Sequence, residues 1–230
     1  MSIVPPRDQL PQEGEMVAVS LTSLLMAHVT ALAADDTDES RAEGQDILDA
    51  VTGYMEQCDE VKNAKNASSM VAAVVDTHIL QDQMRSPQTA SRISCGKGCS
   101  HCCHISVAVD GKEADLIYEM ADGWDEDEVA HMRRQAEFTW EEWMTKPIEQ
   151  RRCIFLKNNT CSIYEFRPAS CRKMFVVSPA EMCDTVAHPK GEIQQWFSLG
   201  AEVMATAAST VFGWGPMAEM ILKRLGYTVK

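Results

Sequence analysis

The stretch that decides the fold runs from residue 95 to residue 183 and opens with Cys95-Gly96-Lys97-Gly98-Cys99-Ser100-His101-Cys102-Cys103. Four thiols fall within these nine residues. Four more follow at widening intervals, so the stretch holds eight of the nine cysteines of the chain: Cys153, Cys161, Cys171 and Cys183 complete the set. Thiols clustered beside glycines suit a tight loop around a soft metal ion, whereas scattered thiols behave as small core residues. The stretch therefore predicts a metal–thiolate centre.

The spacing of the first four thiols also bears on the kind of centre. Cys102 and Cys103 are adjacent, and neighbouring side chains diverge in strands and helices, so both are not expected to bind one tetrahedral ion. Two sites, or one cluster with several metal atoms, fit this spacing better. Eight thiols suffice for two zinc sites, for an iron–sulfur cluster with a zinc ion, or for one occupied site beside free thiols. The sequence does not show how the eight thiols are divided among these sites.

The charge around the later cysteines is unusual for this chain. Seven basic residues stand against two acidic ones, Glu149 and Glu165, between residues 146 and 173, although the whole chain has a formal charge of −13. The basic residues are Lys146, Arg151, Arg152, Lys157, Arg167, Arg172 and Lys173. Cations beside a thiolate centre lower the pKa of its thiols and offset its negative charge, and Arg167 and Arg172 are best placed for this. The alternative is that these residues pair with acidic helices.

The overall composition limits the classes of function. A chain of 230 residues with 45% hydrophobic residues can bury a substantial core. Its excess of acidic residues disfavours binding to phosphate backbones or to anionic membranes, so no nucleic-acid partner is expected and a membrane partner is disfavoured. The first ten residues show no secretory signal, which favours a reducing cytoplasm, where clustered cysteines indicate metal or redox chemistry. Residues 16–34 are uncharged, and we expect a buried helix there instead of a membrane span.

Hydrophobic periodicity predicts a mainly α fold, with a helical bundle around an irregular cysteine-rich metal-binding unit and one short β-hairpin. Helices are expected near residues 15–34, 38–58 and 67–85, and Cys58 and His78 fall on their apolar faces as core residues. The patterns divide the chain into an N-terminal helical region (1–90), a cysteine-cluster region (91–188) with a helical insertion (110–147), and C-terminal helices (189–230) packing on the same core.

Capping and turn residues place the smaller elements. Asp110 with Glu113 and Asp125 with Glu128 have the spacing that begins a helix, and the second helix is expected to continue to Trp143 on one apolar face. Residues 153–164 have the pattern of a small hairpin around Lys157-Asn158-Asn159-Thr160. Residues 178–181 predict a short helix, capped by the Ser178 hydroxyl, that carries Cys183. Two last helices are expected at about 190–210 and 216–225.

Two motifs resemble a known family. They are Cys95-x3-Cys99-x2-Cys102-Cys103 and Cys153-x7-Cys161-Ser-Ile-Tyr164-Glu165-Phe-Arg167-Pro168-x-x-Cys171-Arg172. This pattern is similar to the YkgJ-type family of zinc- or iron-chelating cysteine-cluster proteins, which includes flagellin lysine N-methylases. The resemblance covers about residues 95–183 and implies a metal centre held by the eight cysteines. It also implies an iron–sulfur cluster and S-adenosylmethionine as cofactors of the methylase members. For a protein of this kind we expect Arg167 and Arg172 to orient an anionic group of a substrate or cofactor, with Tyr164 as a further cofactor-binding candidate.

Three functions remain open at this level. The first is an iron–sulfur protein that modifies a protein substrate, with methyl transfer to an amine as its most concrete form. No glycine-rich strand-to-helix loop is present to hold a nucleotide, and the chain is short for the barrel that hosts radical chemistry. The second is a zinc-stabilised module that recruits a protein partner without catalysis. The third is thiol redox chemistry or metal delivery through Cys99-Ser-His-Cys102, with His101 and His104 depressing a thiol pKa.

Overall fold

The computed structural model describes residues 37–96, 98–121, 123–188 and 193–229. The helix predicted near residues 15–34, and with it the question of a membrane span there, lies outside the described residues. By its internal contacts the chain forms two units, residues 1–50 and 51–230, and α2 runs across their boundary. The second unit contains all nine cysteines of the chain.

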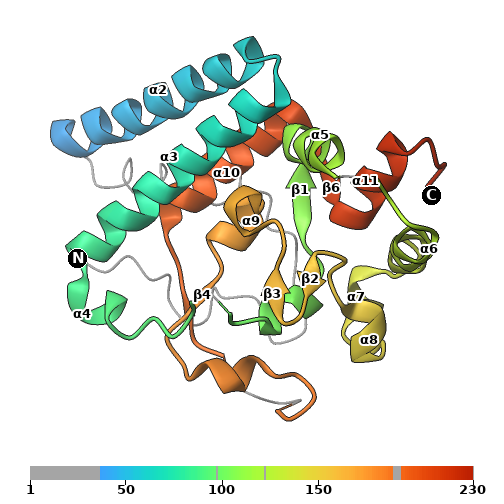
Figure 1. The fold of residues 1–230 in the computed structure, drawn as a ribbon. Coiled ribbons are helices and arrows are strands. Elements are labelled where there is room, and N and C mark those ends of the chain that lie inside the picture. Colours follow the sequence, from blue (N-terminus) through green and yellow to red (C-terminus); the bar gives the residue numbers. More distant parts are fainter. Residues whose placement is uncertain (1–36, 97, 122, 189–192, 230) are drawn as a thin grey trace. The chain divides into compact units, whose positions relative to one another are not determined.

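The described part of the chain is mainly helical, as the periodicity predicts (Figure 1). The helices are α2 (Asp38–Glu60), α3 (Ala64–Arg85), α4 (Pro87–Ala90), α5 (Gly111–Met120), α6 (Glu126–Gln135), α7 (Trp140–Trp143), α8 (Ile148–Arg151), α9 (Ala169–Arg172), α10 (Leu199–Phe212) and α11 (Met217–Arg224). Three 3-10 turns join them: η2 (His101–His104), η3 (Tyr164–Phe166) and η4 (Ala180–Cys183). None of these helices combines the length and apolarity that a membrane span requires.

The described residues form three small antiparallel pairs of strands, two of which connect distant parts of the chain. β1 (Ala108–Asp110) pairs with β6 (Trp214–Pro216), and β4 (Phe175–Val176) pairs with β5 (Gln195–Trp196). The predicted hairpin is confirmed as β2 (Leu156–Lys157) and β3 (Thr160–Cys161). Asn158 and Asn159 form its turn with φ values of 51° and 57°, the left-handed conformation that a two-residue hairpin turn needs and that asparagine tolerates.

Helix α3 packs along α10, and α5 and α9 pack against α3 as well (Figure 1). The buried face of α3 is built from Val71, Val75 and Ile79, and alanines of α10 are buried beside it. Close approach is possible because α10 has Gly200, where a Cβ would lie 2.4 Å from Nδ1 of His78. Cys58 is fully buried, which confirms it as a core residue.

A second core lies where α11 packs on α5 and α6. Its buried members are Ile117, Met132, Ile154, Phe155, Ala218, Ile221 and Leu222. Trp124 and Val129 pack against it from the start of α6, where Asp125 accepts a hydrogen bond from Glu128 N–H at 2.7 Å. Because Ile154 and Phe155 directly follow Cys153, this core supports the cysteine-rich segment.

The structure of the insertion differs from the prediction in one respect. The predicted single helix that continues from Val129 to Trp143 is wrong, because two helices occupy this stretch. Helix α6 ends at Gln135, and α7 begins separately after Thr139, whose hydroxyl accepts a hydrogen bond from Glu142 N–H at 3.3 Å. Phe138 lies between the two helices and packs edge-on against Trp143, with ring centroids 5.8 Å apart. A capping hydroxyl and an aromatic contact thus break a pattern that periodicity alone makes continuous.

Candidate metal centre

All eight cysteines of the 95–183 stretch line one cavity of about 250 Å³. They come from two segments, 95–103 and 153–183, that are separated by the helical insertion. The rest of the wall is largely apolar and includes Phe155, Ile163, Phe175 and Met217. Met217 belongs to α11, outside the stretch that carries the motifs, so the cavity is completed by a helix that the cysteine spacing does not identify.

The first segment is held in place by backbone hydrogen bonds. Cys99 N–H donates to Gly96 O at 3.1 Å, which closes a turn, and η2 then presents Cys102 and Cys103. The Val176 N–H of β4 donates to Cys95 Sγ at 3.3 Å, and Ser94 N–H donates to Val176 O at 3.0 Å. Strand β4 thereby fixes the first thiol, and a backbone N–H already points at its sulfur.

The second segment is tied directly to the first, because Cys153 N–H donates to Cys103 O at 2.7 Å. From Cys153 the chain turns into the hairpin, with Leu156 N–H donating to Cys153 O at 3.0 Å. Leu156 pairs with Cys161 in the register of β2 and β3. The hairpin therefore brings Cys153, which precedes β2, and Cys161, which lies in β3, to the same cavity.

Cys171 lies on the short helix α9, and Glu113 of α5 caps the beginning of that helix. Its Oε1 accepts a hydrogen bond from Ala169 N–H at 2.6 Å, while its Oε2 accepts from Asp110 N–H at 3.0 Å. The capping box of Asp110 and Glu113 is confirmed, since Asp110 Oδ1 accepts from Glu113 N–H at 2.8 Å. The contact with Ala169 carries no sequence signal, because the two residues are 56 positions apart.

Cys183 ends the 3-10 turn η4, which packs against η2 and so against the first thiols. The predicted cap at Ser178 is wrong, because Pro179 is the N-cap residue and no side chain caps this turn. The Ser178 hydroxyl accepts a hydrogen bond from Gln194 N–H at 3.3 Å, and its carbonyl accepts from the Ser94 hydroxyl at 2.6 Å. Tertiary partners thus replace the local cap.

Most of the thiols hold their protons tightly in this arrangement. Burial raises the pKa of Cys153 to about 11 and raises the pKa of Cys171 further, and repulsion from neighbouring thiols adds to both shifts. Burial is also the largest cause of the raised pKa values of Cys95, Cys161 and Cys183. A coordinated metal cation reverses this effect, because a thiol that binds a metal is deprotonated.

Cys102 is the exception, with a pKa lowered to about 7. The main cause is a hydrogen bond from the thiol of Cys103, whose own pKa is raised, and the positive charge of Arg167 adds to the effect. The two neighbouring thiols of this 3-10 turn therefore affect each other's titration. Neither His101 nor His104 contributes to this lowering.

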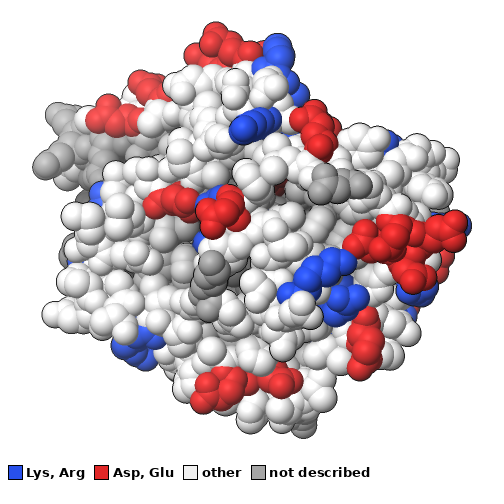
Figure 2. Space-filling model, viewed as in Figure 1, with Lys and Arg blue, Asp and Glu red and all other residues white. Residues whose placement is uncertain are grey.

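The basic residues of the 146–173 stretch fall into two groups. Four pair with acidic side chains, as Lys146 with Glu142, Lys157 with Glu128, Arg172 with Asp76 and Lys173 with Glu202. Figure 2 shows acidic side chains gathered over α6, the helix that supplies Glu128. Arg151, Arg152 and Arg167 have no acidic partner among the described residues. Pairing with acidic helices therefore accounts for only part of the local positive charge.

The three residues predicted to bind a cofactor all line the cavity, but they differ in their partners. Arg172 donates to Asp76 at 2.8 Å and to the carbonyls of Arg167 and Glu165 at 3.0 and 2.7 Å, so its guanidinium is engaged in holding the fold. Arg167 lies over the Tyr164 ring, with Cζ 3.9 Å from the ring centroid, and its guanidinium makes no hydrogen bond within the described residues. Arg167 is therefore the cation available to a ligand.

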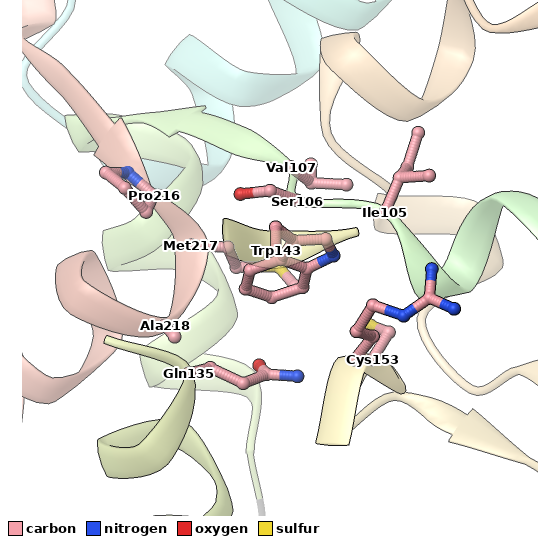
Figure 3. Close-up of a pocket in the computed structure, with 10 residues that line it drawn as sticks. Ile105, Ser106, Val107, Gln135, Trp143, Cys153, Pro216, Met217 and Ala218 are labelled. Atoms are coloured by element: carbon pink, nitrogen blue, oxygen red, sulfur yellow. The ribbon is translucent and has the colours of Figure 1, made fainter. Parts of the chain in front are cut away.

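A second, smaller cavity of about 30 Å³ adjoins the first and shares Ile105, Val107, Cys153 and Met217 with it. Figure 3 shows Trp143 lying among Val107, Met217 and Gln135, between the 105–107 stretch and the start of α11. The Trp143 indole N–H donates to His104 O at 3.0 Å. The insertion thus seals the side of the centre that carries Cys153.

The donor set suits soft metals, because thiolates bind zinc ions and iron–sulfur clusters. No group of three Cys, His, Asp or Glu side chains among the described residues stands close enough to hold one ion. The thiols surround a space instead of meeting at a point. Eight thiols that line one cavity fit a soft-metal centre in their number and their chemistry.

These features define a class, since eight thiols around one cavity in a mainly helical chain are typical of cysteine-cluster chelating proteins. Residues 94–192 match the family model CxxCxxCC, described as a "putative zinc- or iron-chelating domain". Over those residues the chain is similar to this domain, which agrees with the resemblance seen in its motifs. No curated protein and no solved structure matches the chain significantly.

Proposed function

We propose that this protein holds a polynuclear metal centre, in the first instance a [4Fe–4S] cluster bound by four thiolates. The candidate ligands are Cys95, Cys99, Cys102, Cys103, Cys153, Cys161, Cys171 and Cys183, and the four that remain can hold a second site or stay free. The proposal depends on one observation, that cysteines from two distant segments line a single cavity of about 250 Å³. A chain that used these residues only as core would gain nothing from gathering them around a shared space.

The spacing of the thiols favours a cluster over a lone zinc ion. Four sulfurs at about 2.3 Å from one zinc ion lie about 3.8 Å from one another, in a tetrahedron that encloses no further space. The cavity is much larger than that, and no three potential ligands in the described part of the chain are gathered around a point. Cluster ligands stand further apart because inorganic sulfide and several metal atoms lie between them.

We further propose that Arg167 anchors an anionic group of a small ligand beside the centre. Its guanidinium lies over Tyr164 and makes no hydrogen bond with the described residues. Its charge helps to lower the pKa of Cys102 and opposes the burial that raises the pKa of Cys161. A carboxylate is the partner that the planar guanidinium binds best. The carboxylate of S-adenosylmethionine is one candidate, which would allow methyl transfer to a protein amine in a reducing cytoplasm. A bound iron–sulfur cluster supplies one-electron or Lewis-acid chemistry.

The test is the metal content and absorption spectrum of protein purified without oxygen, for the wild type and three serine variants. Wild-type protein is expected to be brown, with iron–thiolate absorption that bleaches in air. Cys102→Ser and Cys171→Ser are expected to lose metal, whereas Cys58→Ser, which alters a fully buried cysteine of the core, retains it.

Colourless protein with stoichiometric zinc would refute the cluster and favour the alternative of a zinc-stabilised module. Equal metal loss from all three variants would show that the ligand assignment is wrong. Protein without any metal, purified from cells supplied with iron and zinc, would overturn the proposed function as a whole.

A further inference from the structure

Arg151, the last residue of α8, is a buried cation that lines the small cavity beside the eight-thiol cavity, with only 4% of its surface exposed. Its Nε donates to Lys146 O at 3.0 Å, and its Nη2 donates to the Thr185 hydroxyl at 3.2 Å. Its Nη1 points at the Met144 sulfur at 3.5 Å. All three acceptors are electrically neutral, so the hydrogen bonds satisfy its donors without balancing its charge.

Some other arginines of the fold have carboxylate partners. Arg172 pairs with Asp76, and Arg224 pairs with Asp115, each at 2.8 Å. Arg151 has no carboxylate within ion-pair distance among the described residues, and its side chain donates there to the three neutral acceptors alone. Arg152 and Arg167 also have no carboxylate partner among the described residues, but Arg152 is exposed and Arg167 half-buried, whereas Arg151 is buried.

Such an arrangement is unfavourable unless a negative charge enters later. A guanidinium keeps its proton in proteins, so Arg151 cannot relieve the burial by becoming neutral. Charges that are buried in folded proteins are paired or lie beside metal centres, because taking an unpaired ion out of water is strongly disfavoured. The missing partner must be a group of opposite charge that lies close by.

The surroundings of Arg151 show where that group lies. Met144 and Thr185 both line the eight-thiol cavity, and Arg151 itself lines the adjoining small cavity together with Cys153. Helix α8 packs against η2, the turn that carries Cys102 and Cys103. Arg151 thus lies near three cysteine-bearing segments. It is beside η2 and two positions before Cys153. It also donates a hydrogen bond to Thr185, which follows η4.

We infer that Arg151 is the built-in counter-charge of the metal–thiolate centre, a positioning residue that holds an anionic centre in place through its charge. The inference rests on the proposed function, because only metal-bound thiolates make the cavity negative. Four thiolates around a divalent ion carry a net charge of about −2, and [4Fe–4S] centres with four thiolates are likewise anionic. A cation fixed in a dry wall acts on such a charge more strongly than one in water.

Two substitutions separate the charge of Arg151 from its shape. Arg151→Met keeps an unbranched apolar stem but removes the charge, whereas Arg151→Lys keeps the charge and loses the planar fork. The measurement is the rate at which metal leaves the loaded protein for an excess of a chromogenic chelator. We expect release from Arg151→Met to be at least about tenfold faster than from the wild type, and release from Arg151→Lys to stay within about threefold.

The same pair of substitutions at Arg224 is the matched control. Arg224 donates to Asp115 and to Gly111 O at 2.7 Å, and it lines neither cavity. Both Arg224 variants are expected to melt at a lower temperature and to release metal at the wild-type rate. If the centre contains iron, loss of the Arg151 charge also shifts its midpoint potential to more negative values, whereas Arg151→Lys leaves the potential near that of the wild type.

A purely structural role for Arg151 predicts the opposite order, with the lysine variant losing metal at least as fast as the methionine variant, and that result would overturn the inference. If Arg151→Met does not accumulate, Arg151→Gln replaces it, since glutamine is neutral and can still donate to Thr185. Wild-type protein that contains no metal would refute the proposed function before the two variants are compared, so the two failures are distinguishable.

Discussion

Glu113 offers the sharpest test of how the fold supports the centre, because one buried carboxylate caps two helices. It accepts hydrogen bonds from Asp110 N–H and from Ala169 N–H, the latter in the helix that carries Cys171. Burial and the nearby Asp110 carboxylate raise the pKa of Glu113 to about 7. In Glu113→Gln only one side-chain oxygen remains, so the amide group must face one of the two backbone donors.

The sign of the pH effect depends on the direction of this pKa shift. A carboxyl group whose folded-state pKa lies above its unfolded value stabilises the fold at low pH and loses that contribution as pH rises through the folded value. The pKa of Glu113 is about 4.3 in the unfolded chain and about 7 in the folded protein. Its ionisation is therefore expected to lower the free energy of unfolding by about 2 to 3 kcal/mol between pH 5 and pH 8. Glutamine does not titrate, so Glu113→Gln lacks this loss.

The assay is urea unfolding of the wild type and of Glu113→Gln at several pH values from 5 to 8. The substitution also removes the effect of the Glu113 charge on the pKa values of Cys171 and Lys173, so the difference between the free energies of unfolding reports Glu113 together with these neighbours. We expect the variant to be less stable by about 1 to 2 kcal/mol at pH 5 and to match or exceed the wild type at pH 8. Glu119→Gln, on the exposed face of α5, should show no such trend. A difference that stays constant with pH would refute the reasoning.

Three further predictions concern the scaffold. Arg172→Met removes the ion pair with the half-exposed Asp76, and we expect thermal unfolding to show a loss of about 1 to 2 kcal/mol; an unchanged melting temperature would contradict this. Asn159→Gly relieves a left-handed residue in the hairpin turn and should stabilise the fold by about 0.5 to 1 kcal/mol in urea, whereas a loss would mean that its side chain matters. Gly200→Ala should destabilise the fold by about 1 to 3 kcal/mol, because the new Cβ would lie 2.4 Å from the His78 imidazole. Gly53→Ala is the control and should stabilise α2, because the space around Gly53 is open. Equal effects of the two substitutions would refute the packing argument.

Local sequence patterns predict much of the fold. The stripe on α2 predicts the burial of Cys58, the spacing of Asp110 and Glu113 predicts the start of α5, and the two asparagines predict the hairpin turn. Each of these depends on residues a few positions apart, where period and capping chemistry are informative. The predicted start near residue 190 of the next helix is too early, because residues 195 and 196 pair as β5 with β4 and α10 begins at Leu199.

The features that sequence patterns miss depend on distant partners. Ser178 is placed by Ser94 and Gln194, and the first turn of α9 is capped from 56 residues away. For the site, clustering and motif resemblance select the cysteines as a group, but neither distinguishes the engaged Arg172 from the free Arg167. In the sequence, the buried and unpaired arginine of α8 is only one basic residue among seven, since burial and partners are tertiary properties. The division of the chain into the three predicted regions stays a prediction.

The most direct test of the account is X-ray absorption spectroscopy at the metal edge of anaerobically purified protein. If thiols from residues 95–103 and 153–183 hold the centre, each bound metal atom should show about four sulfur neighbours at about 2.3 Å, and Cys171→Ser should change that shell. A first shell made of oxygen and nitrogen alone would contradict the account, because the cavity would then be lined by eight thiols that bind nothing.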